Sequence, residues 1–425
     1  MPDWRFFRKV TGLLSVIIVT FATPAAELTD LYQATVPANQ SQAMWQRQAL
    51  QAVLLKLTGS TEVQSLPGLS DALKNSGQFV VQFQQVQQEG QSQLLVTLDG
   101  QKITQLLQSQ QIPVWGPRRP DVLLWLTERP VETPQFVLSP DHPLRKALQT
   151  QATLFGLSIQ FPLFDETDTT LVNEAASWGG DWVLLQQASA RYQATEVYNL
   201  LFDQLTDASG LVQFRLTWQQ LQDGAVQNNE LINADAMVLA QQFCSALAKA
   251  QATRYAVRIA APGASAGSNS LQLTFDGVGS LTDLARLRQL FDAMLTVREH
   301  SLVQYSAGQA VLKLQLSASN EEFYRALSLV RELTPQPDTA APAASVDQVA
   351  VAGTVAEPVI SDAEAAMEAA LGDGTAPVND SAVVTTDATD ANAPAPALPV
   401  GPALSGQNSV AAALQISTRY LFRRQ

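Results

Sequence analysis

The sequence predicts a mixed α+β and α/β protein built from tandem small units, the last of them a ferredoxin-like βαββαβ sheet. Short runs rich in β-branched and aromatic residues alternate with segments whose apolar residues recur every three or four positions, as strands and helices do. Proline and glycine clusters separate these groups of elements. With 425 residues, 46% of them apolar, the chain can bury cores in roughly two to four domains.

Residues 1–26 have the features of a secretory signal peptide. A basic start precedes an apolar run at 10–22, and small residues follow as far as Ala26. The run is shorter than the roughly 17–25 residues of a membrane-spanning helix, which makes a retained anchor the weaker alternative. We therefore expect cleavage after Ala25 or Ala26, export to the periplasm, and no transmembrane span in the mature chain.

Residues 27–116 predict an N-terminal α+β domain. A strand-like run at 31–36 precedes a helix whose apolar residues recur at helical spacing up to Leu57, and Gly59 is the expected C-cap of that helix. Two strands around a turn at Gly90 and a second helix complete the pattern, at positions 79–86, 93–98 and 103–107.

Residues 117–254 predict a small α/β sandwich domain. Three prolines and a glycine at 112–120 interrupt regular structure and mark its beginning. Strands and helices then alternate, as in a layered α/β unit. The expected strands lie at 122–126, 157–161, 196–204 and 210–221, and the expected helices at 144–155, 182–192 and 235–249.

Residues 255–334 predict the third unit, which is one strand short of a ferredoxin-like fold. We expect strands at 255–260 and 271–275, a helix over 281–295, a hairpin from 297 to 316, and a last helix over 323–330. Residues 335–413 carry ten acidic residues and no lysine or arginine, and they are rich in alanine and proline. This composition predicts a disordered linker.

The chain ends in a second strand-like pattern at 414–422. Apolar or aromatic residues alternate with polar ones there, and Tyr420 and Phe422 fall on the apolar side. Because the third unit lacks one strand, we expect residues 414–425 to return across the linker and complete its sheet together with 255–334. A free C-terminal tail is the alternative.

Several short motifs along the chain resemble a family of proteobacterial exported proteins known as domain of unknown function number 2066. The matching segments lie at 31–37, 54–59, 112–116, 119–120, 125–126, 161–163, 178–179, 188–192 and 419–422. The resemblance implies export but no reaction. More distantly, the middle unit is similar to the small α/β domain at the amino end of the Tol-system translocation protein, and to activators of penicillin-binding proteins. That similarity implies a fold alone.

The residues that could carry chemistry are few and scattered. Two histidines, His142 at a helix entry and His300 in an exposed strand, lie far from the single cysteine, Cys244, so no metal-ligand spacing exists. The glycines at 276–280 fit a strand-to-helix turn capped by Ser280 better than a nucleotide loop. The acidic residues at 165–168 are expected in a solvated loop. We predict no catalytic residue, no cofactor and no metal.

Four tryptophans are the candidate interaction or packing residues: Trp115, Trp125, Trp178 and Trp182. They fall near segment ends, where buried indoles anchor the packing of domains. A groove that binds another protein is the alternative.

The formal net charge of −13 argues against polyanion binding, and no stripe of lysine and arginine interleaved with aromatic residues is present, so we expect no nucleic-acid partner. We expect a non-enzymatic interaction scaffold or accessory factor in cell-envelope biogenesis, with an envelope protein as its partner. The alternative is an envelope hydrolase whose site is not visible as a motif. Asp, His and Ser side chains converging in one pocket would favour the hydrolase, and an exposed apolar surface would favour the scaffold.

Overall fold

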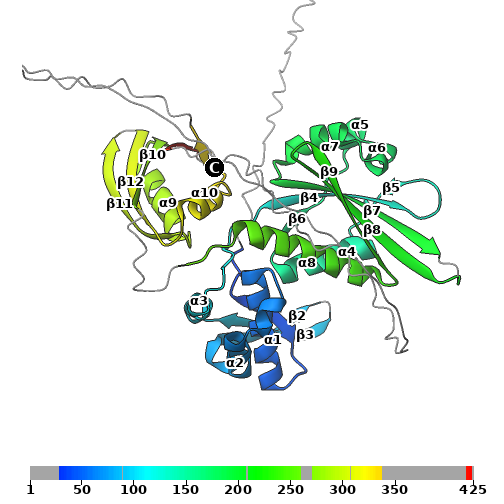
Figure 1. Ribbon diagram of the computed structural model, residues 1–425, viewed down its shortest axis with the longest axis horizontal. Coiled ribbons are helices and arrows are strands. Elements are labelled where there is room, and N and C mark those ends of the chain that lie inside the picture. Colours follow the sequence, from blue (N-terminus) through cyan, green and yellow to red (C-terminus); the bar gives the residue numbers. More distant parts are fainter. Residues whose placement is uncertain are drawn as a thin grey trace, which may run out of the picture. The chain divides into compact units, whose positions relative to one another are not determined.

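The computed structural model describes residues 28–88, 90–206, 209–259, 270–306, 308–336 and 418–423 (Figure 1). These residues form three β-sheets with their helices, all within the unit made of Met1–Asp338 and Leu414–Gln425. The expected signal peptide and nearly all of the expected linker lie outside the described residues. Within those ranges, no helix combines the length and the apolar character needed to cross a membrane.

The first sheet is antiparallel and has the order β1-β3-β2. Its elements are β1 (Gln33–Pro37), α1 (Gln42–Thr58), η1 (Glu62–Ser65), α2 (Pro67–Lys74), η2 (Ser76–Phe79), β2 (Val80–Gln88), β3 (Gln91–Leu98) and α3 (Gly100–Ser109). The predicted end of α1 is confirmed, because Gly59 adopts a φ of 66° and its N–H donates to Leu55 O. α2, a short helix with a proline in its first turn, was not predicted from the sequence.

The second sheet has the order β5-β4-β7-β8-β9, and β6 also pairs with β4. Its strands are β4 (Asp121–Arg129), β5 (Gln135–Phe136), β6 (Ser158–Gln160), β7 (Glu196–Thr206), β8 (Val212–Gln222) and β9 (Ala225–Asn233). Its helices are α4 (Pro143–Phe155), α5 (Glu166–Leu171), α6 (Glu174–Gly179), α7 (Trp182–Ser189), η3 (Ala190–Tyr192) and α8 (Ala236–Tyr255).

Helices cover both faces of β4 in the second sheet (Figure 1). Val122 and Leu124 share a core with α4 and α8, whereas Leu123 and Trp125 share a core with α7. A strand buried on both faces needs apolar side chains on both faces, and this is why residues 122–126 form a continuous apolar run. The strand expected at 255–260 is wrong, because Tyr255 ends α8 and Val257 makes only an isolated bridge to Val114.

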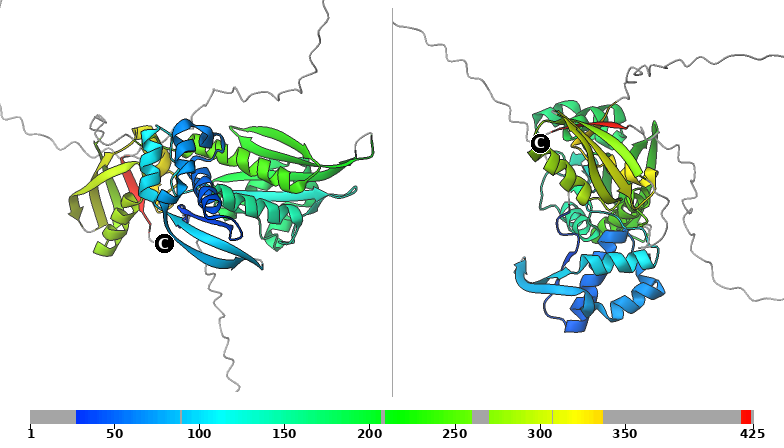
Figure 2. Two further views of the ribbon diagram at one scale, coloured as in Figure 1. Left: turned by 90° about the horizontal axis from the view of Figure 1, so that it is seen from below. Right: turned by 90° about the vertical axis from the view of Figure 1, so that its left-hand side faces the viewer.

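The third sheet has the order β11-β12-β10-β14-β13. Its elements are β10 (Ser270–Val278), α9 (Leu281–Asp292), β11 (Val297–Ser306), β12 (Gly308–Leu316), α10 (Asn320–Leu327), β13 (Leu333–Pro335) and β14 (Arg419–Phe422). In Figure 2 the C-terminal strand β14, in red, lies among the yellow-green strands of this sheet.

The return of the C-terminal strand is confirmed over Arg419–Phe422, but the expected βαββαβ unit is not. β14 pairs in parallel with β10 and antiparallel with β13, a three-residue strand that directly follows α10 and its turn. The sheet therefore has five strands instead of four. A strand as short as Leu333–Pro335 cannot be predicted from the sequence, because three residues are too few to show the alternation of apolar and polar side chains that marks a strand. Residues 414–417 of the expected strand lie outside the described residues.

Candidate functional site

Trp115 and Arg119 fix the connector at 112–120 against the end of α1. Both side chains are buried, and the Arg119 guanidinium lies 3.5 Å from the centroid of the Trp115 ring. Arg119 Nη2 donates to Lys56 O at 2.8 Å, and Trp115 N donates to Leu57 O at 2.7 Å. Burial lowers the pKa of Arg119 well below its usual range. These contacts are internal packing of the connector.

The other three candidate tryptophans belong to the second sheet and its helices. Trp125 in β4 is fully buried, and its Nε1 donates to Ser189 Oγ at 2.9 Å. Trp182, at the start of α7, is buried in the same core cluster. Trp178 in α6 is half-buried, with the Arg129 guanidinium 4.4 Å from its ring centroid. The three indoles pack at separate places among the second sheet and its helices, so they do not gather in one groove.

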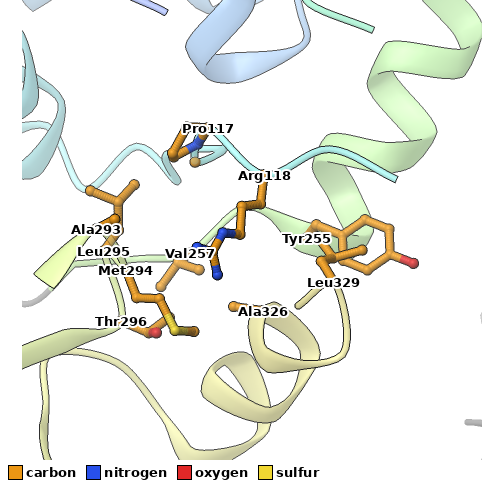
Figure 3. Close-up of a pocket in the computed structure, with 11 residues that line it drawn as sticks. Pro117, Arg118, Tyr255, Val257, Ala293, Met294, Leu295, Thr296, Ala326 and Leu329 are labelled. Atoms are coloured by element: carbon orange, nitrogen blue, oxygen red, sulfur yellow. The ribbon is translucent and has the colours of Figure 1, made fainter. Parts of the chain in front are cut away.

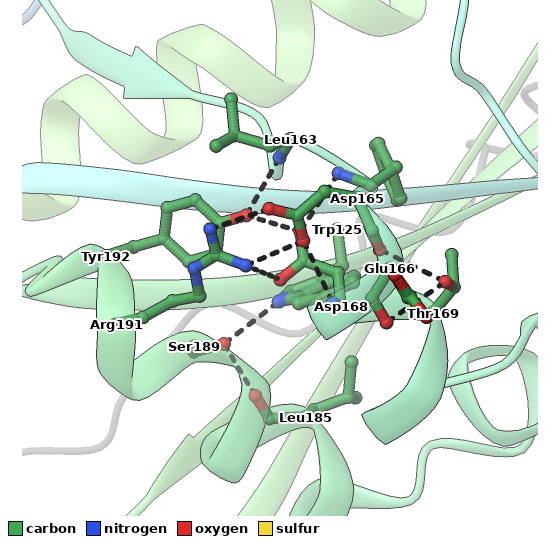
Figure 4. Close-up of polar contacts among 11 residues, drawn as sticks. Trp125, Leu163, Asp165, Glu166, Asp168, Thr169, Leu185, Ser189, Arg191 and Tyr192 are labelled. Atoms are coloured by element: carbon green, nitrogen blue, oxygen red, sulfur yellow. Dashed lines mark hydrogen bonds and ion pairs between the residues drawn. The ribbon is translucent and has the colours of Figure 1, made fainter. Parts of the chain in front are cut away.

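An ion-pair cluster joins the start of α5 to the turn after α7 (Figure 4). Asp165 caps α5 by accepting from Asp168 N at 3.1 Å. Arg191 donates to both Asp165 carboxylate oxygens, at 2.7 and 2.8 Å. The Asp168 carboxylate accepts from Tyr192 Oη and, at 2.9 Å, from Phe164 N. Burial and the bond to Asp168 raise the pKa of Tyr192 above its usual range.

This cluster is closed, because its carboxylates are engaged by side-chain and backbone donors. The expected solvated loop is therefore wrong for Asp168, whose side chain is fully buried. The burial of Asp168 could not be predicted from the sequence, because Arg191 lies 23 residues after it and only the fold brings the two together. Among the described residues, no group of three or more His, Cys, Asp or Glu side chains is placed to hold a metal ion.

We expect the fold around α5 to weaken in acid through Asp165. The Arg191 contact and the N-cap hydrogen bond lower the pKa of Asp165 from 3.8 to about 2. A carboxyl whose pKa is lower in the folded state stabilises the fold above its unfolded pKa, and this contribution is lost as the pH falls through the folded pKa. Wild-type protein should lose it between about pH 4 and pH 2, and Asp165→Asn should lack this step. NMR titration of the Asp165 carboxyl measures the folded pKa, and a midpoint near the ordinary value would contradict the expectation.

Both histidines pair with an acid. His142 is the N-cap residue of α4, and its Nε2 lies 3.1 Å from Glu128 Oε2. His300, expected in a solvated position, is wrongly predicted, because its side chain is only 7% exposed and its Nε2 lies 2.8 Å from Asp292 Oδ1. The Nδ1 atom of each ring is buried and has no hydrogen-bond partner among the described residues. Each ring thus has an acid at one nitrogen and no nucleophile at the other.

Ser280 and Cys244 have structural positions. Ser280 caps α9 as predicted, through a reciprocal capping box with Asp283. Cys244 is fully buried in α8, and burial raises the pKa of its thiol to about 12. A thiol with such a pKa is almost entirely protonated at neutral pH, and the thiolate is the nucleophilic form.

A small cavity of about 40 Å³ lies between the connector, the end of α8, and the third sheet's helices (Figure 3). The Arg118 side chain extends into it, and Thr296 forms part of the opposite wall. Arg118 Nη1 and Thr296 Oγ1 are buried without a hydrogen-bond partner among the described residues. Because drug-sized ligands occupy roughly 300–1,000 Å³, this cavity is too small for a substrate of that size.

Replacing Thr296 with valine should leave the free energy of unfolding unchanged or raise it by about 1 kcal/mol, because the buried hydroxyl has no hydrogen-bond partner in the described part of the chain. Thr127→Val is the matched control. Thr127 is fully buried and its Oγ1 lies 2.7 Å from Ser177 Oγ, so its loss should cost about 1–3 kcal/mol. Denaturant titration compares the two variants, and equal losses would contradict the prediction.

β2 is the least protected sheet edge among the described strands. It has nine residues, VVQFQQVQQ, with no charge and no proline, and its only irregularity is a register shift between Val80 and Gln82. Val81 is 64% exposed and Phe83 is 57% exposed. Charges, prolines, bulges and short length are the usual protections of an edge against pairing with another chain.

The other edge strands carry such protections. β1 ends in Pro37, and Lys56 Nζ donates to its Gln33 O at 3.1 Å. β11 contains Arg298 and Glu299 and two register shifts, and β9 contains Glu230. β5, β6 and β13 have only two, three and three residues. This feature of β2 was not predicted from the sequence, because the place of a strand in its sheet depends on long-range pairing.

Comparison with known proteins gives a match to the N-terminal part of the chain. A family model described as "Domain of unknown function (DUF8605)" matches residues 25–116, the segment that contains the first sheet. No curated protein and no solved structure matches the chain. The expected relationship to domain of unknown function number 2066 is therefore wrong. The short motifs that suggested this relationship consist largely of residues that any packed α+β chain needs, such as the core residues Leu54 and Leu57 and the helix-ending Gly59. The part of the chain that contains β2 is thus similar to a family whose function is itself unknown.

Proposed function

We propose that this protein is a non-enzymatic, exported scaffold of the cell envelope that binds a polypeptide partner by strand addition to β2. The observation that carries the proposal is the uncharged, exposed edge of β2. An extended segment can pair with such an edge through main-chain hydrogen bonds, and its alternate side chains then decide specificity.

The two faces of β2 define the chemistry of the partner. Phe83 pairs with Val96, and Val96 pairs with Ala34, so an added strand would continue this row. On that face its side chains would meet Phe83, whose ring centroid lies 5.0 Å from that of Trp45. The other face of β2 presents glutamine amides such as Gln84, because successive side chains of a strand alternate between faces. Gln85 shares the face of Phe83, and Val86 lies on the face of Gln84. We therefore infer an uncharged partner segment with an apolar residue opposite Phe83 and hydrogen-bonding residues on both faces.

Export rests on the basic start and short apolar run at 1–26. N-terminal sequencing of the protein from a periplasmic fraction should read from Ala26 or Glu27. An intact Met1 recovered in the membrane fraction would contradict export with cleavage.

The hydrolase alternative gains no support from the two histidines. Their Nδ1 atoms lack a serine or cysteine partner among the described residues, and the one cysteine is buried in α8. Ser189 and Ser177, both buried, are occupied by bonds to Trp125 and Thr127.

Site-specific photo-crosslinking in living cells tests the binding edge. A photo-reactive phenylalanine analogue at position 83 should give a discrete protein adduct in the envelope fraction. The same analogue at Val303, which is 53% exposed on β11, is the matched control and should give none. In purified protein, an uncharged extended peptide recovered from the adduct should slow amide exchange along β2.

Two results would overturn the proposal. Equal adducts from positions 83 and 303 would mean that exposure alone causes crosslinking. An adduct from position 83 without protection of the β2 amides would mean that the partner docks in some way other than as an added strand.

A further inference from the structure

Two polar groups in the small cavity beside the connector at 112–120 are not satisfied by the described part of the chain. Arg118 is half-buried, its side chain extends into the cavity, and its Nη1 is buried without an acceptor there (Figure 3). On the opposite wall, Thr296 is only 1% exposed, and its Oγ1 has no partner among these residues either. Buried polar groups are nearly always hydrogen-bonded, and an unpaired donor on a charged group is especially costly. An acceptor that reaches both groups would remove this cost.

The positive charge of Arg118 also lacks an acid in the cavity. Among the described residues that line the cavity, none is an aspartate or a glutamate. Two other arginines close to lining residues in the sequence do have an acid. Arg254 Nη1 lies 3.1 Å from Glu196 Oε1, and Arg331 pairs with Asp121. The ligand that suits the cavity is therefore an anion.

The backbone holds both groups in place. Next to Arg118, Pro117 O accepts from Leu28 N at 3.1 Å. In the turn between α9 and β11, Thr296 O accepts from Ser317 N at 2.9 Å. Groups that are fixed before a ligand arrives bind it with little further loss of conformational freedom. The cavity is therefore organised for binding in the unliganded protein.

The size and the lining of the cavity define the kind of anion. Its volume of about 40 Å³ leaves room for roughly three to four water-sized atoms, at about 10–15 Å³ for each. Its other walls are mainly apolar, with side chains such as Val257, Met294 and Leu329. A carboxylate has two acceptor oxygens, one for each donor, and its planar shape matches a guanidinium. Sulfate and phosphate have four oxygens, which two donors cannot satisfy.

We propose that this cavity is a binding site for a free short-chain carboxylate, of the size of formate or acetate, held by Arg118 and Thr296. An acidic side chain of another protein carries the same group, but it brings a peptide backbone for which a volume of about 40 Å³ has no room. The bound anion would bridge the connector to the turn between α9 and β11. The inference does not depend on β2 or on its proposed partner.

Binding of carbon-13-labelled acetate to the full-length protein, followed by NMR line broadening, tests the site. Wild type should show saturable broadening, together with shifts of the Arg118 and Thr296 amide signals. Arg118→Gln should weaken acetate binding at least about tenfold, because it removes a hydrogen bond from a charged group. Thr296→Val should weaken binding about threefold to tenfold, because it removes a neutral hydrogen bond.

Two comparisons separate binding from charge and from folding. Arg258→Gln is the matched control, because Arg258 is exposed and follows the lining residue Val257, so the same charge is lost outside the cavity. This variant should bind acetate as wild type does. Without acetate, Thr296→Val should be at least as stable as wild type, so its weaker binding cannot come from a damaged fold.

Four results would overturn the proposal. Absence of saturable broadening would mean that the cavity holds only water. Equal losses in Arg118→Gln and Arg258→Gln would mean that acetate follows the surface charge. Displacement of acetate by an equal concentration of chloride would mean that the site does not recognise a carboxylate. Displacement by N-acetyl-glutamate amide would mean that an acidic side chain enters the cavity, and a free short-chain acid would then not be its specific ligand.

Discussion

Replacing Asp168 with alanine should destabilise the helical layer around α7 by about 3–5 kcal/mol, because it removes one partner from a buried ion pair. Asp168 is fully buried, and its carboxylate accepts from Tyr192 Oη, Phe164 N and Arg191. Without it, the Phe164 amide and the Tyr192 hydroxyl lose their acceptor inside the protein, and unsatisfied buried donors are costly. Asp168→Asn should cost less, because the amide oxygen still accepts one of these bonds.

Amide hydrogen exchange in β4 and α7 measures this loss locally, which matters in a chain with several sheets where a single unfolding transition is not assured. Glu166→Ala is the matched control, because Glu166 lies in the first turn of the same helix and is exposed. Its loss should cost less than about 1 kcal/mol. Similar losses in the two variants would show that the cluster around Asp168 contributes little.

Replacing Phe422 with alanine should destabilise the third sheet by about 3–5 kcal/mol, and Tyr420→Ala should have a similar effect. Both side chains are buried in the core that includes Phe275, Leu273 and Phe291. Leu421, between them, points to the other face and is only half-buried, so Leu421→Ala is the matched control and should cost about 1 kcal/mol or less.

Faster exchange of the β10 amides should accompany the loss of either aromatic residue. A chain that ends at Ala413 should show the largest effect, because it lacks the strand altogether. If this shortened chain melts at the wild-type temperature and β10 exchanges no faster, then β14 does not contribute to the stability of the sheet.

Elements with strong local signals were predictable from the sequence. Three elements were predicted: the helix α1 with its C-cap at Gly59, the helix α9 with its N-cap at Ser280, and the hairpin of β11 and β12. In each of them the spacing of apolar residues and the capping or turn residues favour the same structure. The helices α5 and α6 have six residues each, too few for a helical period to be visible. The strand β9, AVQNNELIN, is mostly polar because it lies at an exposed edge, so no apolar alternation marks it.

The features that bear on function depend on long-range contacts, and this is why the sequence predicted them poorly. The burial of Asp168 depends on Arg191 and Tyr192, which follow it by more than 20 residues. The exposure of Phe83 depends on the sheet order β1-β3-β2. By contrast, the aromatic residues Tyr420 and Phe422 could be predicted to be buried, because their alternation is local and the upstream unit lacked a strand.

The first core is closed by residues that come much later in the chain. Ile259 and Leu295 pack against it, Val114 bridges to Val257, and Gly59 lies so close to α8 that an added Cβ would be 2.6 Å from Ala252 Cβ. A ribosome adds about 5–20 residues per second, so Val257 follows Gly116 out of synthesis by about 7–30 seconds. During that interval the segment that matches the family model exists without its last packing partners. Its apolar side is then exposed until Ile259 and Leu295 pack against it and Val257 bridges to Val114.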